Sequence, residues 1–61
     1  MKIKHTVKLK SGAQEVYEFK TKAESDKALW NAEMLQRSFG TIQSILVERV
    51  GHPEKNVLHV F

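Results

Sequence analysis

The chain has 61 residues, no cysteine and a formal net charge of +3. This length allows one domain, residues 1–61, and a chain this short buries only about 60% of its extended surface, so the domain is marginal alone. The absence of cysteine excludes disulfides and thiolate metal sites, which leaves oligomerisation as a candidate source of stability. No apolar run is long enough for a transmembrane helix, and no basic stub precedes an apolar block, so we expect a cytoplasmic protein.

The first ten residues alternate in character and hold the excess positive charge. They contain four lysines and no acid, whereas residues 11–61 contain six basic and seven acidic side chains. The odd positions are Met1, Ile3, His5, Val7 and Leu9. The lysines are Lys2, Lys4, Lys8 and Lys10. Because successive side chains of a strand point to opposite faces, this pattern predicts a strand with one buried face and one lysine face.

A second strand is expected after a Ser-Gly-Ala turn at residues 11–13. Residues 15–20 again alternate, and the two strands form a hairpin whose register depends on the loop length. A three-residue loop places Tyr17 opposite Val7, whereas a two-residue loop places Val16 there. The three-residue loop keeps both aromatic side chains of the second strand on the apolar face, so we expect that register.

A helix is predicted from Thr21 to about Phe39. Thr21 and Glu24 have the spacing of a capping box, and Gly40 can adopt the left-handed conformation that ends many helices. The stripe expected to face a sheet contains Ala28, Leu29, Ala32, Leu35 and Phe39. Trp30 and Met34 lie roughly opposite this stripe, so a helix on one sheet would leave them in water.

The remaining segments predict a second hairpin that is apolar on both faces. It joins residues 41–50 to residues 57–61 through a polar connection that contains the only proline. From the alternation we expect one face of the hairpin to carry Ile42, Leu46, Val50, Val57 and Phe61. The outer face is expected to carry Ile45, Val47, Leu58 and Val60. One helix covers one face of a sheet, so a second copy of the chain is the simplest candidate to cover the rest.

These elements predict an α+β fold. It is a small two-layer domain, an antiparallel sheet of two β-hairpins in ββαββ order, with one amphipathic helix packed on one face. The order of the strands in the sheet stays open. The predicted core is Ile3, Val7, Leu9, Tyr17, Phe19, Ala28, Leu29, Ala32, Leu35, Phe39, Leu46, Val50, Val57 and Phe61.

Two candidate binding surfaces follow from these patterns. The first is a partner interface made by Trp30, Met34, Ile45, Val47, Leu58 and Val60. The second is a nucleic-acid contact made by Lys2, Lys4, Lys8, Lys10 and Lys20. No aromatic side chain or arginine lies among these lysines, which favours a solvated face with lysines that protect a strand edge.

The sequence offers little support for catalysis, a cofactor or a metal. It contains no phosphate-binding glycine loop and no nucleophile elbow, and the spacing of its three histidines matches no metal motif. We therefore expect a non-catalytic interaction or regulatory module, a homodimer or a partner of another protein, with no small-molecule substrate and no membrane contact. The alternative function is nucleic-acid binding through the lysine face of the first strand.

Overall fold

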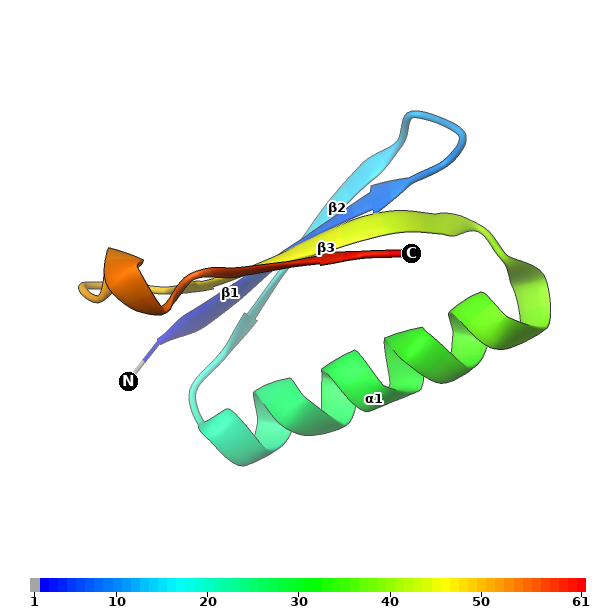
Figure 1. The fold of residues 1–61 in the computed structure, drawn as a ribbon. Helices are drawn as coiled ribbons and strands as arrows, with labels where there is room; N and C mark the ends of the chain where they lie inside the picture. Colours follow the sequence, from blue (N-terminus) through cyan, green and yellow to red (C-terminus); the bar gives the residue numbers. More distant parts are fainter. Residues whose placement is uncertain (1) are drawn as a thin grey trace.

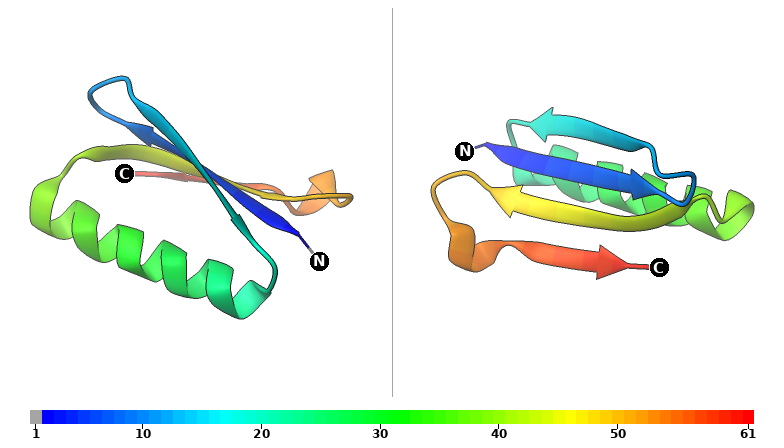
Figure 2. Two further views of the ribbon diagram at one scale, coloured as in Figure 1. Left: turned by 180° about the vertical axis from the view of Figure 1, so that it is seen from behind. Right: turned by 90° about the horizontal axis from the view of Figure 1, so that it is seen from above.

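The computed structural model describes residues 2–61 and shows a small α+β domain. Its elements are β1 (Ile3–Leu9), β2 (Gln14–Phe19), α1 (Lys22–Phe39), β3 (Ile42–Arg49), a 3₁₀ turn (Pro53–Lys55) and β4 (Val57–Val60). The strands form one antiparallel sheet, and α1 lies across one of its faces (Figure 1, Figure 2). The predicted fold class and the ββαββ order are confirmed.

The strand order is β2-β1-β3-β4, which places β1 inside the sheet. β1 pairs with β2 on one side and with β3 on the other. The chain therefore passes from β2 through α1 to β3 over the strand that separates them (Figure 2). The free edges of the sheet are β2 and β4. The expectation that the lysines of the first strand protect an edge is wrong, because that strand has a neighbour on both sides.

The first hairpin has a three-residue loop, but the loop lies one residue earlier than predicted. The Leu9 N–H donates to the Ala13 carbonyl at 2.9 Å, and the Gly12 N–H donates to the Leu9 carbonyl at 3.0 Å. Gly12 has a φ of 93°, as expected where a tight turn ends in a bulge that requires positive φ. The register shifts by two residues, so Tyr17 pairs with His5 and not with Val7. An even shift leaves each side chain on its predicted face.

The ends of α1 follow the predicted capping residues. Thr21 Oγ1 accepts a hydrogen bond from the Glu24 N–H at 3.2 Å. At the other end, Gly40 has a φ of 63°, and its N–H donates to the Gln36 carbonyl at 2.8 Å. Gln36 Oε1 also accepts from the Ile42 N–H at 2.7 Å, which ties the end of the helix to the start of β3.

A bulge in β3 places the residues that follow it on the opposite face of the sheet from the one predicted. Val7 pairs with Ile45, but Leu9 pairs with Ile42, so β3 contains one extra residue at this point. Ile42 and Ile45 therefore face α1 together, and Ile45 is fully buried with 0% exposure. The expected outward facing of Ile45 and Val47 is wrong, as is the expected inward facing of Leu46, because strict alternation does not hold across a bulge.

The second hairpin pairs Val47 of β3 with Val57 of β4. The longer connection contains Gly51 at a φ of 85° and the 3₁₀ turn, and the Asn56 side chain accepts from the Arg49 N–H at 3.1 Å. Leu46, Leu58 and Val60 consequently share the face of the sheet away from α1.

The core is smaller than predicted and centres on the two inner strands. The buried apolar residues are Ile3, Val7, Ile42 and Ile45, with Leu9, Leu29, Ala32 and Val47 packed against the cluster. Six predicted core residues are exposed: Tyr17, Leu35, Phe39, Val50, Val57 and Phe61. Leu35 and Phe39 are exposed because the twist of the sheet separates the tip of the β1–β2 hairpin from the C-terminal half of α1 (Figure 1). Val57 and Phe61 lie on or just after the edge strand β4.

Candidate protein interface

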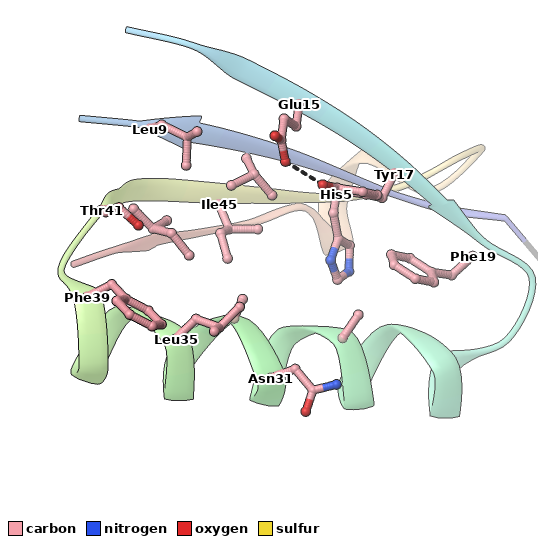
Figure 3. Close-up of a pocket in the computed structure, with 14 residues that line it drawn as sticks. His5, Leu9, Glu15, Tyr17, Phe19, Asn31, Leu35, Phe39, Thr41 and Ile45 are labelled. Atoms are coloured by element: carbon pink, nitrogen blue, oxygen red, sulfur yellow. Dashed lines mark hydrogen bonds between the residues drawn. The ribbon is translucent and has the colours of Figure 1, made fainter. Parts of the chain in front are cut away.

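An apolar groove of about 430 Å³ opens between α1 and the β1–β2 side of the sheet. Its walls come from β1, β2, the start of β3 and the sheet-facing side of α1 (Figure 3). Leu35 and Phe39 project into it from the helix, and Tyr17 and Phe19 line it from β2. Phe39 is 71% exposed although it lies on the stripe that faces the sheet. Water therefore reaches side chains that a packed domain of this class would bury.

Few polar groups line this groove. On its β2 wall the Tyr17 hydroxyl donates a hydrogen bond to Glu15 Oε2 (Figure 3). This bond raises the pKa of Tyr17, because the hydroxyl proton is held by the carboxylate. Asn31 and Thr41 complete the polar part of the lining. An apolar groove with few polar groups is suited to apolar side chains of a partner.

His5 closes the inner end of the groove and is almost completely buried. Its Nε2 atom lies 2.6 Å from Ser25 Oγ, and its ring packs on Phe19 at a centroid distance of 4.7 Å. Ser25 is the only buried residue of α1. The sequence indicated that His5 shares a face with apolar residues, but not its partner. Ser25 lies on the same helical stripe as Ala28 and Ala32, which could have identified it.

The environment of His5 favours the neutral imidazole. Burial lowers the pKa of His5 most, electrostatic repulsion from the neighbouring His59 lowers it further, and Asp26 opposes both. A neutral ring keeps one nitrogen as an acceptor, and the Ser25 hydroxyl can serve as donor or acceptor to it. We assign this pair a structural role, since it joins the start of α1 to the centre of the sheet.

The predicted interface residues lie on three separate surfaces. Trp30 is 60% exposed, and it lies with Met34 on the part of α1 turned away from the sheet. Leu58 and Val60 are exposed on the opposite side of the molecule, on the open face of the sheet. Ile45 and Val47 belong to the core side instead. The structure therefore does not bring this set together, whereas it gathers Tyr17, Leu35 and Phe39, which were predicted to be core.

The lysines of β1 share the open face of the sheet, but acidic side chains interrupt them. Lys4 lies between Glu18 of β2 and Glu48 of β3 in the two registers. Lys2 Nζ lies 3.3 Å from Glu18 Oε2. Lys8 and Lys10 remain exposed on β1 and just after it, and Lys20 is exposed just after β2.

The described part of the chain contains no metal-binding group and no spanning helix. Within residues 2–61, no three His, Asp or Glu side chains lie close enough together to hold a metal ion. In the same residues, α1 is not apolar enough to cross a membrane.

Comparison with known proteins found no match to a family model, to a curated protein or to a solved structure.

Proposed function

We propose that this protein is a non-catalytic interaction module that self-associates through the open side of α1 and β2. The observation that carries the proposal is the apolar groove flanked by Tyr17, Leu35 and Phe39. Clusters of exposed large apolar side chains on a small domain mark surfaces that bind other proteins. A second copy is the partner that the fold itself supplies, and homo-oligomers are the commonest soluble assemblies.

The size of the core supports this proposal. The central cluster consists of a few aliphatic side chains, and the aromatic residues of β2 and α1 are outside it. A domain of this length buries little apolar surface, so contact with a partner would add stability that the single chain lacks. The protein would then act by binding to another protein chain, as an adaptor, an inhibitor or a regulatory subunit does.

Nucleic-acid binding is the second candidate, favoured by the lysines that share the open face of the sheet. Lys8 and Lys10 are the exposed members without an acidic side chain directly opposite in β2 or β3. Glu18 and Glu48 weaken the positive field around Lys4. Contacts of lysine with phosphate would be sequence-independent and strongly salt-dependent.

Light scattering across protein concentration tests both candidates. We expect a mass above that of the monomer at low and high salt, unchanged by a short DNA duplex, because apolar contacts are little affected by salt. The variant Phe39→Ser should reduce association at least tenfold, since this exposed ring belongs to the groove. Val60→Ser is the matched control, because Val60 is 70% exposed on the opposite face of the sheet.

Three results would contradict self-association through the groove. They are a monomer at every concentration, an unchanged mass for Phe39→Ser, and an equal loss for Val60→Ser. A monomer that gains mass only with DNA and only at low salt would instead support the lysine face.

A further inference from the structure

The two free edges of the sheet differ in their protection against pairing with another strand, since β4 has only four residues, whereas β2 has six and its charged side chains are Glu15 and Glu18. Exposed edge strands are commonly interrupted by lysine, proline or a bulge, because their unpaired N–H and C=O groups can bind a further strand. β2 contains no lysine and no proline, and its pairing with β1 is regular over the whole strand. The lysines of this hairpin lie on the interior strand instead. The β2 edge is therefore open to pairing.

The hydrogen-bond pattern of the hairpin identifies the groups that β2 presents outward. The Leu9 N–H donates to the Ala13 carbonyl, so these two residues form a hydrogen-bonded pair of the ladder. Such pairs alternate along antiparallel strands. The main-chain groups of Gln14, Val16 and Glu18 consequently point away from β1, toward solvent.

These outward groups match a second copy of the same strand. A two-fold axis at Val16 pairs Val16 with Val16 of the second copy, and Gln14 with its Glu18. Each of these pairs can exchange two main-chain hydrogen bonds. No two like charges lie directly opposite in this register, and an amide faces each Glu18 carboxylate.

The side chains on the groove side also match in this register. Glu15 lies opposite Tyr17 of the second copy. Within one chain the Tyr17 hydroxyl already donates to Glu15, so the same donor and acceptor meet across the seam. A two-fold axis perpendicular to the sheet keeps both helices on the same face. The two grooves then form one continuous groove. The sides of the two helices that carry Leu35 and Phe39 face each other across the seam.

The β4 edge does not offer the same match. α1 packs closest to β1 and β2, and the groove opens on the β2 side of the molecule. Pairing through β4 would place the two grooves at opposite ends of the extended sheet and leave them uncovered. A stable dimer buries about 800 Å² on each partner, which a short strand edge alone does not supply. α1 also flanks the β4 edge, but the hollow there is smaller, about 250 Å³, and charged side chains such as Lys22, Asp26 and Arg49 line it.

We infer that two copies pair through antiparallel β2 strands, with the two-fold axis at Val16, to form one continuous sheet with both helices over the seam. This inference rests on the proposed self-association and specifies its surface and register. Val16 is 51% exposed and lies on the open face, so the axis is accessible to chemical probes.

Single cysteine variants test the register, because the chain has no cysteine of its own. In the proposed dimer the Cα atoms of the two Val16 residues lie about 5.5 Å apart, within the range of a disulfide. Val16→Cys should cross-link under mild oxidation at low micromolar protein, at least tenfold faster than two controls. Gln14→Cys has the same strand and face, but its two copies would lie roughly 14 Å apart. Val60→Cys reports on the β4 edge.

Each alternative result has a definite meaning. Faster cross-linking of Gln14→Cys would show a different register, and faster cross-linking of Val60→Cys would place the seam at β4. Equally slow cross-linking of all three would exclude the register with its two-fold axis at Val16. In each of these cases the inference fails, whereas a dimer mass that persists in light scattering would leave the proposed self-association standing.

Discussion

His5 is a titratable side chain at the junction of α1 and the sheet, and its environment predicts how stability depends on pH. Burial lowers the pKa of His5 below the value of 6.5 expected for an unfolded chain. As the pH falls through about 6.5, the unfolded state binds the proton first, and the folded state loses stability. Above this range both states are neutral, and the contribution of His5 is constant.

We therefore expect the free energy of unfolding to be lower at pH 5 than at pH 8. Each pKa unit of difference between the two states contributes about 1.4 kcal/mol at a pH below both values. Chemical unfolding across pH measures the slope, and NMR titration of His5 measures its pKa directly. An ordinary or raised pKa for His5 would contradict the prediction.

Among the secondary-structure elements, β3 contains a bulge that determines which of its side chains are buried in the core. Ile45 is fully buried in contact with the helix side, whereas Leu58 of β4 is 59% exposed on the open face. Ile45→Ala removes buried methyl groups and should cost about 2–5 kcal/mol of stability. Leu58→Ala should cost less than about 1 kcal/mol in the single chain.

Urea unfolding of the two variants at a low protein concentration measures this difference. A strand without the bulge would place Ile45 on the outer face, and Ile45→Ala would then be the milder change. Comparable losses for the two variants would also contradict the facing that the structure shows.

At the scale of the whole molecule, one helix covers only part of one sheet face, so stability should depend on association. If the folded chain pairs with a second copy and the unfolded chain does not, mass action raises the melting temperature with concentration. A tenfold increase in protein corresponds to about 1.4 kcal/mol, which shifts the melting temperature of a small domain by several degrees. Calorimetry or circular dichroism over a hundredfold range of concentration measures this shift. A melting temperature that does not change with concentration would contradict it.

The sequence by itself determined the features that depend on local chemistry. Thr21 and Gly40 defined the helix because a hydroxyl caps its first turn and a glycine accepts the left-handed conformation that ends it. Alternation placed His5 and the lysines on opposite faces of β1, because side chains of a strand alternate regardless of its neighbours. The prediction of a partner surface came from comparing the number of apolar faces with the single helix available to cover them, and it stays a prediction.

Only the tertiary structure decided the features that depend on pairing between distant segments. The bulge in β3 appears where Leu9 pairs with Ile42, and no local pattern revealed that the alternation is interrupted there. The interior position of β1 converted its lysines from edge residues into central ones. The twist of the sheet then separated the first hairpin from the C-terminal half of α1, which changed Phe39 from an expected core residue into part of an open groove. Such geometry arises from long-range contacts, which a pattern of neighbouring residues does not encode.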